Sequence, residues 1–257
     1  QFMQQRNLFD FMRRMLVKRF ESSFGAFEQS IKNFKEITTI AQAFINKTEE
    51  YILDRDLLER IYEDDDDEIE KQLQEYEEKI NKGEYPKNHE RYKLKDFKER
   101  ERFEKDIQSD LDLFDEILEE LNKLDLVKQD PKTACLIDNV KKQLKQKPDK
   151  GEPQRKVIIF SEYVDTVLYL KKALTKQFGE KILVVAGDLS ASKIHQINKN
   201  FDAMYPEQED KFDLLLTSDK LSEGFNLNRA GMVINYDIPW NPVRVIQRVG
   251  RINRISK

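Results

Sequence analysis

Asp213-Leu-Leu-Leu-Thr-Ser-Asp-Lys-Leu-Ser-Glu-Gly-Phe-Asn-Leu227 and Lys156-Val-Ile-Ile-Phe-Ser161 decide the fold of this chain. Each contains a short apolar run that ends in small polar residues. Runs this short are typical of strands buried on both faces of a parallel sheet. The predicted strands are Val157–Phe160, Ile182–Ala186, Leu214–Leu216 and Met232–Asn235, and the predicted helices are Val164–Gln177, Ala191–Met204 and Pro242–Arg251. This alternation predicts an α/β domain.

The first half of the chain has a different pattern. Apolar residues between positions 8 and 61, and again from Phe103 to Leu121, are spaced by three and four, which predicts helices. Asp130-Pro131 is a helix start, with an N-capping aspartate and a proline in the first turn. We therefore predict an all-α helical region at 1–130, with an acidic, exposed insert near 62–95. The α/β domain follows at 131–257, with its sheet beginning at about 155.

Charge is distributed unevenly along the 257 residues, whose net charge is −4. Seven of the eight residues from Glu63 to Glu70 are acidic, whereas residues 242–257 carry five basic side chains and no acidic one. The net charge is therefore a poor guide to binding partners. The lone Cys135 excludes an internal disulfide and fits a reducing cytoplasm. With no long apolar run, we expect a cytoplasmic protein with no membrane partner.

The C-terminal basic segment places three polar side chains on one helical stripe. Gln247, Arg251 and Arg254 stand at positions i, i+4 and i+7. Guanidinium groups donate hydrogen bonds in a fixed fork that suits phosphate oxygens. The alternative is an ordinary solvated basic face, to which Arg244 and Arg248 would add. Spacing alone leaves both interpretations open.

Small polar residues follow the predicted strands directly. They are Ser161, Gly187, Thr217, Ser218 and Asp237. Ligands of parallel sheets gather outside the carboxyl ends of the strands, so these positions are candidates for ligand contacts. Each is equally suited to an ordinary turn. His89 and His195 are isolated and have no metal-ligand spacing, so no metal site is predicted.

The ordered motifs resemble those of superfamily 2 helicases. Lys156–Ser161 resembles motif IV, Thr217–Leu227 resembles motif V, and Gln247–Arg254 resembles motif VI. Tyr236–Pro242 is similar to a linker of Swi/Snf-type ATPases, and the whole set resembles the Swi/Snf-like bacterial ATPase that associates with RNA polymerase. The resemblance covers roughly residues 155–255. More weakly, Arg13–Ser23 resembles the helical segment that those proteins place before motif IV.

The resemblance implies a RecA-like lobe, the C-terminal lobe of a P-loop NTPase helicase, and a division of roles within it. Arg251 and Arg254 would be arginine fingers with Gln247 orienting the cluster; Gly224, Asn226 and Glu223 would contact the nucleotide; Ser161, Gly187, Thr217 and Ser218 would contact the nucleic-acid backbone. The cofactor would be ATP. Asn226 stands where the related DEAD-box helicases have aspartate.

One motif is absent from the sequence. No Gly-x-x-x-x-Gly-Lys-[Ser/Thr] phosphate loop occurs in the chain. We therefore expect the second half of a two-lobed motor, inactive alone, with Mg²⁺ held mainly by the missing first lobe. The expected partners are that first lobe, double-stranded DNA, with RNA as the alternative nucleic acid, and a protein partner for the helical region. The alternatives are an RNA helicase lobe, or a regulatory protein-binding module with an inert lobe.

Overall fold

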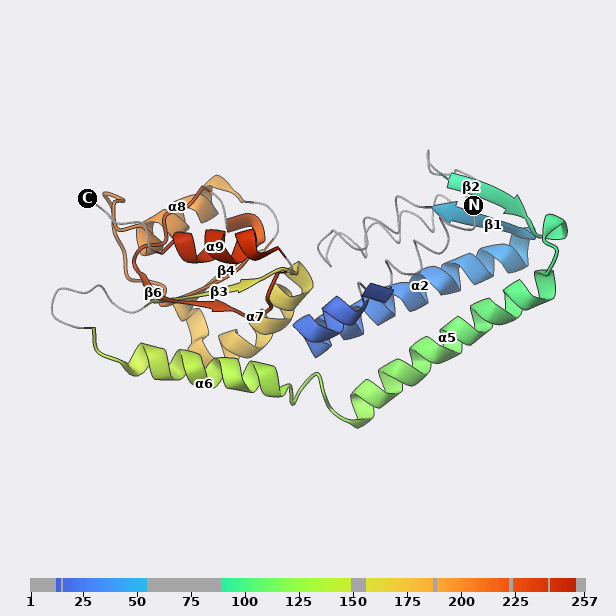
Figure 1. Ribbon diagram of the computed structural model, residues 1–257, viewed down its shortest axis with the longest axis horizontal. Helices are drawn as coiled ribbons and strands as arrows, with labels where there is room; N and C mark the ends of the chain where they lie inside the picture. Colours follow the sequence, from blue (N-terminus) through green and yellow to red (C-terminus); the bar gives the residue numbers. More distant parts are fainter. Residues whose placement is uncertain are drawn as a thin grey trace. The chain divides into compact units, whose positions relative to one another are not determined.

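A computed structural model describes residues 13–14, 16–54, 89–148, 156–186, 189–221, 224–239 and 241–252. The chain forms two compact units (Figure 1). The first comprises Gln1–Arg19 and Phe27–Lys128, and the second comprises Phe20–Ala26 and Gln129–Lys257. The acidic run at 63–70 lies outside the described residues. None of the described helices is both long and apolar enough to cross a membrane.

The first unit is built on two long antiparallel helices. They are α2 (Phe24–Thr48), whose residues up to Ala26 belong to the second unit, and α5 (Arg100–Lys123). Phe34 stacks on Phe114 with ring centroids 6.2 Å apart, and Gln42 Nε2 donates to Gln108 Oε1 at 3.0 Å. A single 3-10 turn, Leu94–Asp96, precedes α5 and buries Leu94. The helical spacing of aromatic and aliphatic residues therefore predicted these helices correctly.

A two-stranded sheet interrupts this helical unit. β1 (Glu50–Asp54) pairs antiparallel with β2 (His89–Lys93), so the expectation of an all-α region is wrong at these residues. Tyr51 lies opposite Tyr92, with stacked rings 6.4 Å apart, and the Arg91 guanidinium pairs with Glu50. Cross-strand pairs of this kind stabilise a strand only when both partners are present. The partner of Tyr51 lies some forty residues away in the chain. The spacing of nearby residues alone therefore wrongly predicted a helix at β1.

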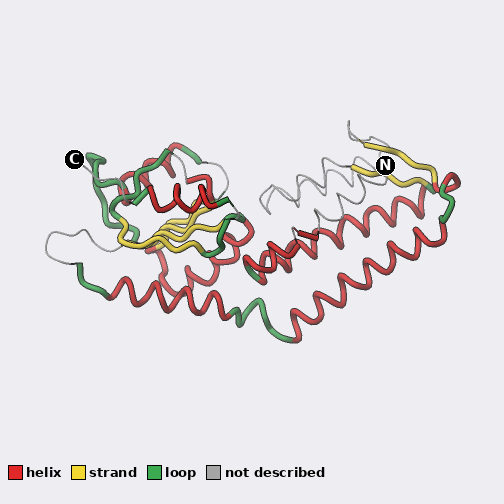
Figure 2. Tube along the Cα trace, in the orientation of Figure 1, coloured by secondary structure: helices red, strands yellow, loops and turns green. Residues whose placement is uncertain are grey.

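The second unit is a four-stranded parallel sheet between helices. The strands are β3 (Lys156–Ser161), β4 (Ile182–Val185), β5 (Leu214–Ser218) and β6 (Ala230–Asn235), in the order β4-β5-β3-β6. The helices are α6 (Pro131–Lys145), α7 (Val164–Phe178), α8 (Ala191–Phe201) and α9 (Pro242–Gly250), with short 3-10 turns at Gly179–Lys181 and Asp219–Leu221. Figures 1 and 2 show α6 and α7 on one face of the sheet and α8 and α9 on the other. The predicted α/β architecture is confirmed.

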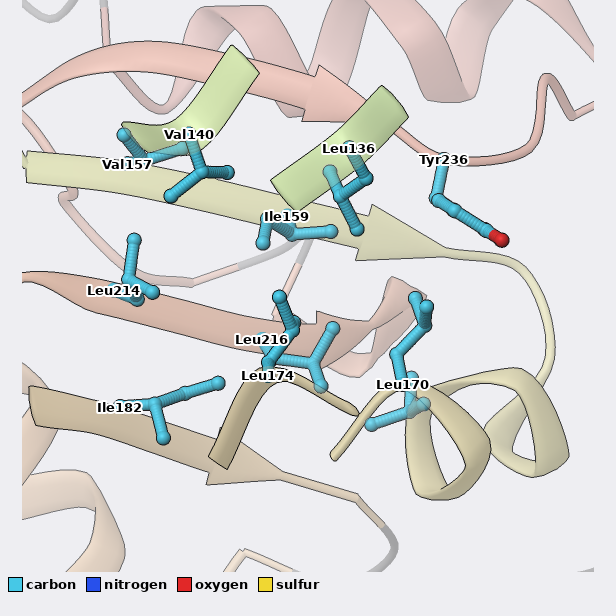
Figure 3. Close-up of a cluster of buried hydrophobic side chains, with 11 residues drawn as sticks. Leu136, Val140, Val157, Ile159, Leu170, Leu174, Ile182, Leu214, Leu216 and Tyr236 are labelled. Atoms are coloured by element: carbon cyan, nitrogen blue, oxygen red, sulfur yellow. The ribbon is translucent and has the colours of Figure 1, made fainter. Parts of the chain in front are cut away.

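Alternate residues of the central strand β3 face opposite cores. Val157 and Ile159 pack with α6 and α7 (Figure 3), whereas Ile158 and Phe160 pack with α8. All four side chains are fully buried. Burial on both faces explains why the strand is a continuous apolar run instead of an alternating one.

Asp130 joins three elements of the second unit. Its Oδ1 accepts from the Lys132 N–H at 2.9 Å, which caps α6. Its Oδ2 accepts from the hydroxyls of Thr133, Tyr169 and Tyr236 at 2.7–3.2 Å. Burial raises the pKa of Tyr169 to about 12 and also raises the pKa of Tyr236, so neutral phenols that donate are favoured over phenolates beside the Asp130 carboxylate. The cap predicted from sequence therefore also ties α6 to α7 and to the end of β6.

We expect Gly25→Ala to destabilise the second unit by about 1–3 kcal/mol. Three carbon atoms of the Tyr169 ring would lie under 3.0 Å from a Cβ at residue 25. The ring cannot simply swing away, because its hydroxyl is bonded to Asp130. Urea denaturation measures the effect.

Gly250→Ala is the matched control. No heavy atom lies within 4 Å of a Cβ built there, and alanine favours the helix. The control should be neutral or stabilising by up to roughly 1 kcal/mol. Equal unfolding midpoints for the two variants would contradict the close packing of Gly25 on Tyr169.

Candidate functional site

The carboxyl edge of the sheet brings three predicted contact residues together. Ser161 ends β3 and pairs in register with Ser218, which ends β5. Thr217 pairs with Phe160 on one side and Val185 on the other. The two strands run one or two residues further than predicted, so these side chains lie in the strands and not in the loops beyond them. All three are buried.

Two of these hydroxyls are engaged inside the protein. Ser161 Oγ donates to Asp237 Oδ2 at 2.5 Å and accepts from the Tyr163 N–H at 3.3 Å. Thr217 Oγ1 donates to the Ser218 carbonyl at 3.2 Å. The Ser218 hydroxyl, by contrast, has no hydrogen-bond partner among the described residues. Contact with a nucleic-acid backbone at these positions stays a prediction, and Ser218 offers the least engaged hydroxyl of the three.

The Asp237 carboxylate accepts several hydrogen bonds at this edge. One carboxylate oxygen accepts from Ser161 Oγ and from Ser22 Oγ at 2.7 Å, and the other accepts from the Glu162 N–H at 2.6 Å. The sequence made Asp237 a candidate for ligand contact because it follows a strand, but its carboxylate is engaged inside the protein. The residue fixes the chain where β6 leaves the sheet and leads to α9.

Arg248 is the largest fully buried side chain of the protein's described part. Nε donates to Asp219 Oδ1 at 2.6 Å, and Nη1 donates to Asn235 Oδ1 at 3.0 Å and to the Asp237 carbonyl at 3.2 Å. The guanidinium carbon lies 5.4 Å from the centroid of the Phe160 ring. The interpretation of Arg248 as part of a solvated basic face is therefore wrong. Its burial follows from the acceptors at the ends of β5 and β6, Asp219, Asn235 and Asp237, which were the available signal in the sequence.

Arg244 lies one turn earlier and is half exposed. It donates from Nη1 to Asp219 Oδ2 at 3.2 Å and to Glu162 Oε1 at 3.4 Å. Asp219 therefore accepts from two arginines of α9, one buried and one in solvent. This pair of contacts joins the end of β5 to α9.

Helix α9 turns a charged side chain toward the sheet and several aliphatic side chains toward solvent. Asn241 caps the helix by accepting from the Val243 N–H at 3.0 Å. Ile252 packs against the core beside α8, whereas Val249 is 41% exposed. Val243 and Ile246 are also exposed. Because Arg248 occupies the inward position of the helix, its aliphatic neighbours turn outward.

Gln247 and Arg251 are half-buried on α9. The Leu227 N–H donates to the Arg251 carbonyl at 3.0 Å, which links the segment after β5 to the end of this helix. The backbone of Arg251, independent of its side chain, thus anchors the helix end. Arg254 lies outside the described residues, and its predicted role stays a prediction.

Gly224 is exposed and has a φ of +82°, in the left-handed region that glycine favours. No heavy atom lies within 4 Å of a Cβ built on it. Asn226 is half-buried, and its Nδ2 lies 3.5 Å from Asp202 Oδ2. Glu223 and Gly187 lie outside the described residues. The nucleotide contacts of Gly224, Asn226 and Glu223 and the nucleic-acid contact of Gly187 therefore stay predictions.

The chemistry of the donor set fits a phosphate-rich ligand. Gln247 and Arg251 lie one helical turn apart and together offer an amide and a guanidinium fork. An exposed glycine with open space above it suits close approach of a ligand. Across the described ranges, no group of histidine, cysteine, aspartate or glutamate side chains could hold a metal ion. If ATP binds here, this lobe would contribute donors to its phosphates.

Residues 132–256 match the helicase conserved C-terminal domain family. The second unit is therefore a helicase C-terminal domain, a RecA-like lobe of the superfamily 2, Swi/Snf-like class.

Three relatives support this assignment. The chain is 32% identical over 137 residues to the uncharacterized ATP-dependent helicase YqhH of Bacillus subtilis, covering 53% of this chain and 21% of that protein. It is 31% identical to the RNA polymerase-associated protein RapA of Sodalis glossinidius, covering 40% of this chain and 10% of that protein. It is also 31% identical to the SNF2 domain-containing protein CLASSY 3 of Arabidopsis thaliana, covering 40% and 7%. The chain thus spans about a fifth or less of the length of these relatives.

We expect Arg248→Met to lower the free energy of unfolding by about 2–4 kcal/mol. The substitution keeps an apolar stem but leaves Asp219 and two strand-end acceptors without their buried donor. Arg244→Met removes the half-exposed partner of the same Asp219 and should lower it by less than about 1 kcal/mol. Chemical denaturation of both variants measures the difference. Similar losses from the two substitutions would show that the buried contacts of Arg248 do not hold the helix.

Proposed function

We propose that this chain supplies the second motor lobe of an ATP-dependent, Swi/Snf-like translocase that acts on double-stranded DNA. The observation that carries the proposal is the position of α9 in a helicase C-terminal domain. Arg248 fixes this helix to the ends of β5 and β6, and Gln247 and Arg251 lie on the adjoining turns. Rigid support of this kind is what a group acting on a transferring phosphate requires.

Arg251 and Arg254 are proposed to act as arginine fingers. ATP, when bound between this lobe and the first lobe, supplies the phosphoryl group that is transferred. Arg251 and Arg254 would then neutralise the charge that develops on that group, and Gln247 would orient them. An arginine finger is worth about 10³–10⁵ in rate. Gly224, Asn226 and Glu223 would adjoin the nucleotide, and Mg²⁺ would be held mainly by the first lobe.

Nucleic acid is proposed to bind along the carboxyl edge of the sheet. Ser161, Gly187, Thr217 and Ser218 would contact phosphates through backbone N–H groups and, at Ser218, through a hydroxyl. Such contacts ignore base sequence, so binding should be sequence-independent and should weaken with salt. A duplex-tracking motor needs contacts of this kind because it must step over every sequence.

We expect Arg251→Ala, introduced into the intact two-lobed protein, to remove most DNA-stimulated ATPase activity, by about 10³-fold or more. Its melting temperature should stay unchanged, because alanine keeps the backbone carbonyl that accepts from Leu227. Ile246→Ala, at a 70% exposed position of the same helix, is the control and should change neither quantity. An Arg251→Ala protein that melts early yet keeps its turnover per folded molecule would assign the arginine a structural role instead.

The 257-residue chain alone should not hydrolyse ATP. It has no phosphate loop, and its described residues hold no cluster of metal ligands. Phosphate release is measured with Mg²⁺ and with or without duplex DNA, and the intact protein serves as positive control. DNA-stimulated turnover by the chain alone would refute the assignment of this lobe as one half of the active site.

A further inference from the structure

The segment before α2 is held inside the helicase lobe by a line of buried hydroxyl groups. Ser22 and Ser23 are buried, and so is Thr166 of α7. Ser22 Oγ lies 2.7 Å from both Asp237 Oδ2 and Thr166 Oγ1. Ser23 Oγ lies 3.2 Å from Thr166 Oγ1 and accepts from the Ala26 N–H at 3.0 Å. The line therefore runs from the start of α2 to the loop that leads into α9.

The chemistry of its two ends fixes the direction of every hydrogen bond. A carboxylate only accepts, so Ser22 donates to Asp237. Thr166 must then donate to Ser22, and Ser23 must donate to Thr166. The Ala26 N–H only donates, so it closes the line at Ser23. Each of the three hydroxyls thus donates one hydrogen bond and accepts one within the line. The opposite direction is impossible, because the Asp237 carboxylate cannot donate and the Ala26 N–H cannot accept.

The Asp237 end of this line is also linked to α9. The Asp237 side chain accepts from Ser22, while its carbonyl accepts from Nη1 of Arg248. The backbone of the segment is held as well, since Lys132 Nζ donates to the carbonyls of Glu21 and Ser22 at 2.9 and 2.8 Å. A shift of Asp237 would therefore move an acceptor of the arginine that anchors α9.

We propose that Ser22, Thr166 and Asp237 are positioning residues for Gln247 and Arg251. They act through Arg248 and set the placement of Gln247 and Arg251 without touching a ligand. This inference rests on the proposed function, because it assumes that Arg251 acts on ATP. The segment that contains Ser22 precedes the helicase motifs by more than a hundred residues. This segment thereby becomes part of the structure that positions the site.

The first test uses two substitutions at Thr166 in the intact protein. Thr166→Val keeps the shape of the side chain but removes the hydroxyl, whereas Thr166→Ser keeps the hydroxyl. Because arginine fingers act on charge that develops in the transition state, the valine variant should lose about fivefold or more in kcat with little change in the KM for ATP. The serine variant should stay within about twofold of the parent. A valine variant with normal kcat overturns the inference.

A second test separates positioning from general stability. Ser22→Ala and Asp237→Asn should each lower kcat, and their double variant should lose less than the product of the two effects, because both break the same line. Leu174→Ala, in the core on α7, is the control: it should lower the melting temperature and leave kcat per folded molecule unchanged. Independent effects of Ser22 and Asp237 on kcat would overturn the inference. If Thr166→Val does not fold, this cycle decides alone.

Arg251→Ala separates failure of the proposed function from failure of the positioning role alone. If Arg251→Ala keeps full turnover, the proposed function fails, and the positioning role fails with it. If Arg251→Ala stops turnover while Thr166→Val and Ser22→Ala keep normal kcat, only the present inference fails.

Discussion

The buried ion pair between Arg248 and Asp219 is the constraint on which the second unit depends. A guanidinium with no solvent exposure requires several acceptors at once, and the ends of β5 and β6 supply them. This requirement fixes the rotation of α9. It explains why Val249 and Ile246 face solvent while a charged residue faces the sheet. The same rotation of α9 sets the positions of Gln247 and Arg251.

Local patterns in the sequence predicted most of the second unit. The runs at Val157–Phe160 and Leu214–Leu216 are strands because both faces of the sheet are covered, and the Asp130-Pro131 start of α6 follows from capping chemistry. These signals are contained in a few neighbouring residues. The helices α2 and α5 were predicted for the same reason.

The features that sequence analysis missed depend on partners distant in the chain. β1 forms only because Tyr92 and Arg91 meet Tyr51 and Glu50 from the far side of a long insertion. The burial of Arg248 depends on Asp219 and Asn235, and nothing within α9 itself indicates it. Asp237 gains its role from Ser22, which lies 215 residues earlier. Spacing rules report local periodicity, so they cannot detect such pairs.

The strand order also dictates when the domain can fold during synthesis. β3 pairs with β5 and β6 and has no pairing with β4, the strand that follows it in the chain. A nascent chain that has emerged only as far as β4 therefore has no neighbouring strand to form a sheet with. Ser22 leaves the ribosome long before its acceptor Asp237, which lies 215 residues later in the chain. Pairing between such distant segments is slow, so Ser22 stays without this acceptor until the segment after β6 has been synthesised.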